Sequence, residues 1–253
     1  MNDKEIELIR ESMHELRVFN DRLLTSTQKL GQSLKTHRLG EGEPLNCNSV
    51  HADDIRTSVM NVQHLTKLSM IRMSFIDYEL NPDFFSESEP YPVNIYGKFL
   101  ANKIALNATS KKHKVKIKLD KSPDNIKLIN AVTLIDILPF LILDNAIKYS
   151  PNECDVNVHF TAYLDEIEVK VVSTGPYVPH KELKRLVTKG YRGSNAKALT
   201  NIKGQGIGLY FADSIAKLHD ARMELSSSES TYCLNGISYS DFTVTLRLPV
   251  TEV

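Results

Sequence analysis

The sequence predicts an α+β protein in which a helical hairpin precedes a two-layer sandwich of helices and strands. The first part of the chain repeats apolar residues at helical spacing, a break rich in Pro and Ser follows, and the remainder mixes helical with alternating patterns. Such a mixture, without strict alternation of strand and helix, is typical of the α+β class. We therefore expect a helical domain at residues 1–82 and a sandwich domain at residues 92–253.

Two long stretches carry the repeat of an amphipathic helix. Residues 2–35 and 52–80 place mostly apolar residues alternately three and four positions apart, and a polar loop at 36–49 joins them. Each stripe is too narrow to bury the flanks of its helix, so two hairpins pairing as a dimeric four-helix bundle is the natural arrangement. The alternative is that these helices pack on the rest of the chain in a monomer.

The second domain carries shorter patterns of both kinds. Helical spacing covers residues 93–110, 131–149 and 207–218, the second of these despite Pro139. Strand patterns occur at 114–119, 126–128, 156–163, 166–173, 222–226 and 242–248. Alternation of apolar and polar residues indicates strands with one buried face, so these elements predict one sheet covered by helices.

The charge and cysteine content narrow the function classes. The 31 basic and 31 acidic side chains cancel, which gives no bulk electrostatic case for binding nucleic acid or a membrane. The three cysteines are odd in number and widely separated, so neither a metal site nor a disulfide framework is expected. The charged N-terminus lacks the apolar core of a signal peptide, and no apolar run is long enough to span a bilayer. These observations predict a cytoplasmic protein.

A helix with a polar edge is the first candidate nucleotide contact. In LPFLILDNAIKYSP, residues 138–151, apolar side chains place one face in the core, while Asn145, Lys148 and Tyr149 gather on another. An Asn oxygen can join a Mg²⁺ shell, and a Lys ammonium suits phosphate. The alternative is an ordinary core helix with a polar edge.

Alternating glycines are the second candidate contact. In KGQGIGLYFADSIAKL, residues 203–218, Gly204, Gly206 and Gly208 lead into an amphipathic helix. Glycines let backbone amides approach a phosphate, and a helix N-terminus attracts anions. The spacing is not the P-loop pattern, which needs Lys-Ser/Thr after the last glycine. Nor is it a good Rossmann fingerprint, since no clear strand leads into it.

Two loop segments complete the pattern. VVSTGPYVP, residues 171–179, contains a strand end, a glycine turn and a proline, a combination that can line an adenine pocket. KGYRGSNA, residues 189–196, follows with an aromatic residue, an arginine and a glycine. In this order, the Asn helix, the glycine turn, the aromatic-Arg-Gly segment and the GxGxGL helix start resemble the N, G1, F and G2 boxes of the GHKL ATPase superfamily. The likeness is greatest to the ATPase domain of sensor histidine kinases, and it spans residues 93–249.

The resemblance implies a GHKL (Bergerat) α/β sandwich that holds ATP and Mg²⁺ beneath a flexible lid at residues 194–203. It implies that Asn145 binds Mg²⁺ and that Lys148 and Tyr149 lie beside the phosphates and adenine. The other residues that it places at the nucleotide or at the base of the lid are Ser173, Gly175, Tyr191, Arg192, Gly204, Gly206, Gly208 and Leu209. Two positions depart from the family pattern. Ser173 stands where the family has Asp, a stronger acceptor for the adenine amino group, and Leu141 stands where it has Asn or Glu.

A histidine in the first helix is the candidate phosphoacceptor. MHELR, residues 13–17, looks like the H box of histidine kinases, and the helical repeat turns His14 and Glu15 away from the apolar seam. Phosphoryl transfer to imidazole needs an accessible ring nitrogen and a carboxylate that holds or deprotonates the ring, the role expected of Glu15. Val18 and Phe19 replace the family's Thr or Asn and its Pro. The alternative is that His14 is an ordinary histidine on a solvated helix face.

These features predict a histidine kinase core that forms a homodimer, receives its input from a separate sensor protein and phosphorylates a response-regulator receiver domain. The alternative is a non-catalytic histidine phosphotransfer or scaffold dimer with a degenerate ATPase domain, which Ser173 and Leu141 favour. A GHKL Ser/Thr kinase is a third possibility, which the long hairpin opposes. We expect His219, after the last helix, to be structural.

Overall fold

The computed structural model describes residues 20–21, 23–30, 32, 49–81, 83, 87–199, 204–229 and 231–250. The chain divides into two compact units, Met1–Phe84 and Phe85–Val253. Within the described ranges, no helix combines the length and the apolar character needed to cross a membrane.

The first unit contains a long helix, α2, which runs from Ser49 to Leu80 over the second stretch of predicted helix. Val59, Thr66, Met73 and Leu80 recur every seven residues along α2, and all four are exposed. Residues 20–21, 23–30 and 32 of the first predicted helix are also helical, and the rest of that stretch lies outside the described residues. A mostly apolar stripe with a period of seven is typical of a helix that pairs with other helices.

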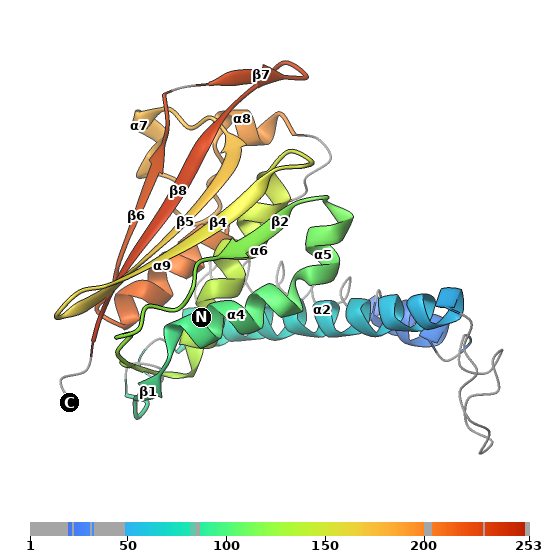
Figure 1. Cartoon of the computed structure of the whole chain (residues 1–253), viewed down its shortest axis with the longest axis horizontal. Coiled ribbons are helices and arrows are strands. Elements are labelled where there is room, and N and C mark those ends of the chain that lie inside the picture. The colour runs from blue at the N-terminus through green and yellow to red at the C-terminus, as the bar shows by residue number, and fades with distance from the viewer. Residues whose placement is uncertain are drawn as a thin grey trace. The chain divides into compact units, whose positions relative to one another are not determined.

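The second unit is built on a mixed six-stranded sheet (Figure 1). Its strands are β2 (Lys116–Leu119), β4 (Asp155–Ala162), β5 (Glu166–Pro176), β6 (Arg222–Ser227), β7 (Tyr232–Leu234) and β8 (Ile237–Pro249). The hydrogen-bonded order is β2-β4-β5-β8-β6, with β7 also paired to β8. Only β2 and β4 are parallel, so the connection between them is a crossover that includes a helix. A separate antiparallel pair is formed by β1 (Tyr91–Val93) and β3 (Ile129–Ala131).

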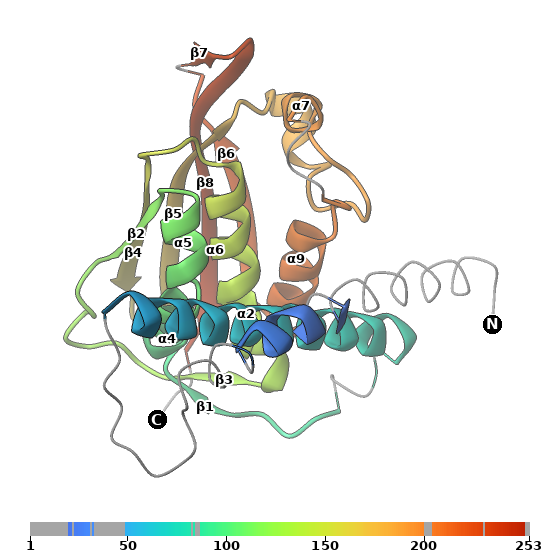
Figure 2. The same ribbon diagram turned by 90° about the vertical axis from the view of Figure 1, so that its right-hand side faces the viewer.

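Helices cover one face of this sheet (Figure 2). They are α4 (Ile95–Ala105), α5 (Asn107–Lys112), α6 (Leu138–Tyr149) and α9 (Gly208–Leu218), and α6 packs against both α4 and α9. Alternate strand residues such as Val158, Val169 and Leu246 are fully buried. The rings of Phe99 on α4 and Phe160 on β4 meet edge to face, 5.6 Å between centroids. The second unit is therefore the predicted two-layer α/β sandwich, held by a core between helices and sheet.

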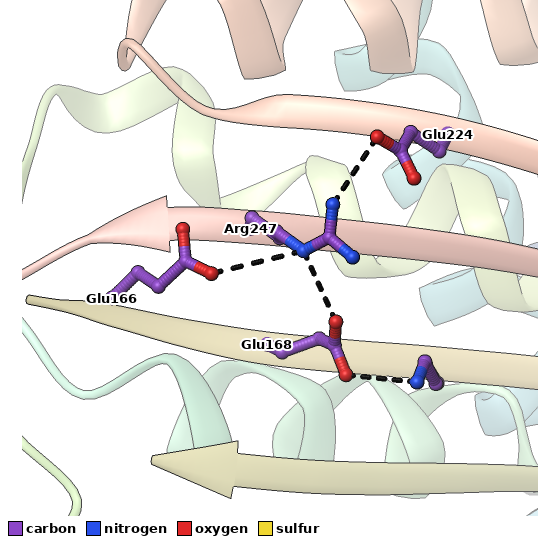
Figure 3. A network of polar contacts seen from close by, with 5 residues as sticks. Glu166, Glu168, Glu224 and Arg247 are labelled. Carbon is purple, nitrogen blue, oxygen red and sulfur yellow. Dashed lines mark hydrogen bonds and ion pairs between the residues drawn. The ribbon is translucent and has the colours of Figure 1, made fainter. Parts of the chain in front are cut away.

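The other face of the sheet carries charged side chains that pair with one another (Figure 3). Arg247 Nε on β8 lies 3.1 Å from Glu168 Oε2 and 3.7 Å from Glu166 Oε1, and Arg247 Nη1 lies 3.2 Å from Glu224 Oε1. Lys170 Nζ lies 2.9 Å from the second oxygen of Glu168. The hydrogen bond from Lys170 lowers the pKa of Glu168, and desolvation opposes this effect. Arg247 lowers the pKa further. This buried carboxylate is therefore kept ionised by two cations.

The helix expected over residues 131–149 is interrupted. Its first residue ends β3, a 3-10 turn, η1, covers Thr133–Asp136, and α6 begins only at Leu138. Pro139 lies in the first turn of α6, where a missing backbone N–H breaks no helical hydrogen bond. The proline thus marks the start of the helix, whereas the apolar pattern alone predicted a start too far toward the N-terminus.

Four other predicted elements of the second unit differ from those observed, by their division or by more than two residues at an end. The strand expected at 126–128 is wrong, because the residues that pair with β1 are those of β3. The helix expected over 93–110 is divided at Leu106 into α4 and α5. The strands expected at 166–173 and 242–248 are parts of the longer β5 and β8. Pairing of β5 with β8, and of β8 with β7, sustains extended backbone where the side chains no longer alternate.

His219 fixes the C-terminal end of α9, in agreement with its predicted structural role. Its Nε2 accepts a hydrogen bond from the Val132 backbone N–H at 3.1 Å, and its Nδ1 donates to the Ile215 carbonyl at 2.7 Å. The ring is buried, and desolvation lowers its pKa below the ordinary 6.5. A neutral imidazole therefore ties α9 to the segment between β3 and η1.

Candidate functional site

The predicted polar edge of α6 is accessible. Asn145, Lys148 and Tyr149 are each half-exposed, while Ala146 and Ile147 between them are buried. Residues three and four positions apart are neighbours on a helix surface, so the three polar side chains share one edge. The amide of Asn145 and the ammonium of Lys148 therefore reach the same side of α6.

The end of α6 meets the glycine segment. A Cβ placed on Gly204 would lie 3.3 Å from Tyr149 Oη, so the tyrosine hydroxyl lies directly against the backbone of Gly204. The two helices that carry these segments, α6 and α9, also pack against each other and stand side by side in Figure 2. The tertiary structure thus brings the Asn helix and the glycine segment into contact.

Gly206 forms a tight turn ahead of α9. Its φ is +71°, and a Cβ there would lie 2.4 Å from the Tyr191 carbonyl oxygen and 2.7 Å from the Gly190 carbonyl carbon. The Gly190 amide also donates to the Gly206 carbonyl at 3.2 Å. Both the left-handed backbone and the close approach require glycine. The glycine turn is therefore docked on the backbone at the base of the predicted lid.

The N-terminus of α9 is open. The helix begins at Gly208, and among the described residues no side chain forms an N-cap hydrogen bond to it. A Cβ on Gly208 would have no heavy atom within 4 Å, and Leu209 after it is half-exposed. Uncapped amides at the positive end of a helix dipole attract anions. This donor set fits the phosphates of a nucleotide.

The third predicted segment lies on a strand. Ser173 is buried on β5, and it belongs to the same alternating set as Val169 and Val171, so it faces the helices. Gly175 continues β5 and pairs with Ser240 on β8, so the glycine turn expected there is wrong. Pairing with β8 keeps the backbone extended where glycine and proline in the sequence indicated a break.

The predicted lid begins with a short helix, α8 (Ser194–Lys197). Arg192 turns back toward it, and its Nη2 donates to the Ala196 carbonyl at 2.9 Å. Residues 200–203 of the predicted lid lie outside the described residues. Arg192 thus fixes the start of the lid by a contact inside its own segment.

Tyr191 is held by three charged side chains. Its hydroxyl donates to Glu182 Oε2 at 2.9 Å. The Arg185 guanidinium lies 4.3 Å from the ring centroid and the Lys197 ammonium lies 5.6 Å from it, both within cation–π range. Desolvation first, and then Glu182, raises the pKa of Tyr191, so the phenol stays neutral and donates.

Two residues that contact predicted site residues were missed from the sequence. Glu182 lies in α7 (His180–Leu183), a helix of four residues with no periodicity to reveal it. Asp144 pairs with Lys148 one turn later on α6, and its other oxygen is buried without a hydrogen-bond partner in the part of the chain described. The i,i+4 spacing of this Asp and Lys was a signal that could have identified the pair.

The remaining predicted residues, His14 and Glu15, lie outside the described residues. His113, at the C-terminal end of α5, lies near the Asp144–Lys148 pair. Burial first, and then Lys112, lowers the pKa of His113, while Asp144 opposes this effect. His113 is therefore neutral at pH 7 and contributes no charge beside Lys148.

Comparison with known proteins agrees with this arrangement. Residues 140–252 match the family described as "Histidine kinase-, DNA gyrase B-, and HSP90-like ATPase". Over this part of its length the chain is similar to sensor histidine kinases. It is 31% identical to sensor protein QseC of Escherichia coli K12 over 121 residues, which are 48% of this chain and 25% of QseC. It is 35% identical to the phosphate regulon sensor protein PhoR of Pseudomonas aeruginosa over 83 residues, 33% of this chain and 18% of PhoR. The aligned segments thus span a quarter or less of these curated relatives.

Solved structures show the same fold. The mycobacterial sensor histidine kinase MprB matches with a TM-score of 0.51 and 16% identity, over 65% of this chain and 99% of that one. Full-length ShkA, solved in complex with AMPPNP, matches with a TM-score of 0.55 and 14% identity, over 98% of this chain and 46% of that one. At such identities the likeness concerns the fold alone, and the second unit has the fold of a histidine kinase ATPase domain.

Proposed function

We propose that the protein is a histidine kinase that transfers the γ-phosphoryl group of Mg-ATP to His14 and then to an aspartate of a response-regulator receiver domain. The observation that carries the ATP part is the docking of the Gly206 turn on the base of the lid, between the open start of α9 and the polar edge of α6. The turn and the start of α9 offer backbone amides, and the polar edge of α6 offers a lysine and an amide oxygen. These are the groups that phosphates and a hard cation require.

Each residue of this site has a distinct role in the proposal. Asn145 supplies an oxygen ligand to Mg²⁺, which neutralises phosphate charge when bound, and Lys148 contacts the phosphates. The amides after Gly206 and Gly208 hold the phosphates at the helix start. Ser173 accepts a hydrogen bond from the adenine amino group with its hydroxyl, more weakly than a carboxylate.

The phosphoacceptor and partner parts of the proposal rest on the helical unit and on relatives. His14 is the nucleophile and Glu15 orients or deprotonates its ring. The exposed heptad stripe of α2, which includes Val59, Met73 and Leu80, supports pairing of two copies in a bundle. Histidine kinase ThkA, solved in complex with response regulator TrrA, has the same fold with a TM-score of 0.53 at 13% identity, which is compatible with such a partner. Input then comes from a separate sensor protein.

Incubation with γ-labelled ATP and Mg²⁺ tests the proposal. Wild type should acquire acid-labile label, and both His14→Ala and Asn145→Ala should lose it. His64→Ala on α2 and Asn157→Ala on β4 are matched controls that should keep the label. Label that survives His14→Ala would exclude His14 as the acceptor.

One alternative has specific support. Ser173 and Leu141 replace polar residues of the family pattern, which favours a phosphotransfer or scaffold dimer with a degenerate ATPase domain. In that case the wild type acquires no label from ATP, whereas a phosphorylated receiver domain still exchanges its phosphoryl group with His14. Restoring the family residue with Ser173→Asp should then strengthen ATP binding.

A further inference from the structure

Glu182 accepts three hydrogen bonds from the predicted lid and its base. Its Oε2 accepts from the Tyr191 hydroxyl at 2.9 Å and from the Ser194 backbone N–H at 3.0 Å. Its Oε1 accepts from the Ser194 hydroxyl at 2.9 Å. Both carboxylate oxygens thus accept hydrogen bonds from residues that follow Glu182 by 9 and 12 positions in the sequence. Such a convergence on one side chain organises the segment around it.

The charge of Glu182 strengthens these bonds. The hydrogen bond from the Ser194 amide lowers the pKa of Glu182, and desolvation opposes this effect. The hydrogen bonds from the Ser194 and Tyr191 hydroxyls lower the pKa further. Hydrogen bonds to an ionised acceptor are about twice as strong as neutral ones. A Cβ on Gly193 would lie 3.7 Å from Glu182 Oε2, an ordinary van der Waals distance, so the contacts of Glu182 do not depend on glycine at this position.

The contacts continue from Glu182 to the glycine turn. The Tyr191 ring is held by Glu182 at its hydroxyl and by Arg185 over its face. The backbone of the same tyrosine forms the surface on which Gly206 packs, and the neighbouring Gly190 amide bonds to the Gly206 carbonyl. A displacement of Tyr191 therefore moves the support of the glycine turn.

We propose that Glu182 is a positioning residue that fixes the base of the lid and, through Tyr191, holds the glycine turn in the conformation that receives the phosphates. The inference rests on the proposed nucleotide site. Glu182 acts through Tyr191 and does not itself contact the phosphates. It reduces the ordering that ATP binding must otherwise impose on the lid base, as pre-organisation does in general.

Hydrogen exchange of the protein without nucleotide tests the positioning directly. In Glu182→Ala, the Ser194 amide should exchange at least about tenfold faster, because it loses its hydrogen bond to a charged acceptor. The Gly190 and Tyr191 amides should also exchange faster, because the Tyr191 hydroxyl loses the acceptor that fixes this residue. Glu182→Gln should give a smaller acceleration, since one acceptor oxygen remains. The matched control is Glu229→Gln, which replaces an exposed carboxylate outside these contacts by a carboxamide. It should not change the exchange rates of these amides. Unchanged exchange at these amides in Glu182→Ala would overturn the inference.

Titration with an ATP analogue then links the positioning to function. Glu182→Ala should weaken analogue binding by about tenfold, and the KM for ATP should rise more than kcat falls. The double variant Tyr191→Phe with Ser194→Ala should reproduce the loss, because it removes both hydroxyl donors while leaving the carboxylate. Equal affinity for wild type and Glu182→Ala would contradict the role in nucleotide binding.

The two proposals fail in different ways. If wild type binds no ATP analogue while Glu182→Ala still accelerates exchange at the lid base, the nucleotide function is wrong and the positioning contact stands. If wild type binds the analogue and Glu182→Ala alters neither exchange nor affinity, the ATP site stands and the role of Glu182 is wrong.

Discussion

The two ends of α9 are built in opposite ways. At the N-terminal end no described side chain caps the helix, and the preceding turn at Gly206 lies against the backbone of Gly190 and Tyr191. At the C-terminal end the buried imidazole of His219 accepts one backbone N–H and donates to one carbonyl. The first end has no side-chain cap among the described residues, whereas the second has its backbone groups bonded to a buried side chain.

Under the proposed function, the difference separates nucleotide binding from stabilisation of the fold within one helix. Backbone amides that must hold a phosphate cannot also be capped by a side chain, so that end is stabilised by glycine packing instead. The closed end has no such requirement, and a buried side chain can join the helix to the loop ahead of η1. Changes at the two ends should therefore affect different measurable properties.

The largest expected effect is that of Gly206→Ala. The new Cβ would lie 2.4 Å from the Tyr191 carbonyl oxygen, at a φ of +71°. We expect a loss of about 3 kcal/mol in unfolding free energy, or local displacement of the turn with loss of ATP-analogue binding. Gly208→Ala is the matched control and should stay within about 0.5 kcal/mol of wild type, because its Cβ meets nothing within 4 Å. A Gly206→Ala variant that keeps both the urea stability and the ATP-analogue affinity of wild type would contradict the described turn.

His219→Ala should come next. It removes a buried side chain with two hydrogen bonds and leaves the Val132 amide without its acceptor, which costs about 2 kcal/mol. Urea unfolding measures the loss. In the folded variant, ATP-analogue affinity should stay close to that of wild type, since the open end of α9 is untouched. A variant that kept its stability but lost nucleotide binding would reverse the division between the two ends.

Acidification should weaken the closed end in wild type. Because the folded-state pKa of His219 is lowered from 6.5, the unfolded chain binds the proton more readily. The stabilisation is therefore complete above the unfolded pKa and is lost as the pH falls from about 6.5 through the folded pKa. His113 shifts in the same direction, so the difference between wild type and His219→Gln isolates the effect. The urea midpoint of His219→Gln should fall less steeply with acidification than that of wild type.

The smallest effect is expected away from both ends, on the open face of the sheet. Arg247→Met removes one of the two cations beside Glu168 but leaves Lys170 at 2.9 Å. The urea midpoint should fall by less than in His219→Ala, because Arg247 is itself partly exposed and Lys170 remains beside Glu168. ATP-analogue affinity should not change, since this network faces away from the helices (Figure 3). A larger loss than that of His219→Ala would show that the open face is a main source of stability.

Much of the site could be predicted from local chemistry. The polar edge with Asn145 and the start of α9 at Gly208 lie where their residue types indicated. The expected turn at Gly175 is wrong, because the pairing partners of a strand cannot be found from its own residues. Glu182 was missed for a related reason: its partners Tyr191 and Ser194 become neighbours only when the chain folds back after α7.

The sequence by itself determined the two-layer sandwich, the polar edge of α6 and the glycine start of α9, because periodicity, helix geometry and glycine freedom are local properties. Only the tertiary structure decided the lengths of β5 and β8, the docking of Gly206 on Tyr191 and the closure of α9 by His219. Those features depend on hydrogen bonds and close contacts between segments far apart in the chain. No local pattern encodes which backbone group will lie opposite another.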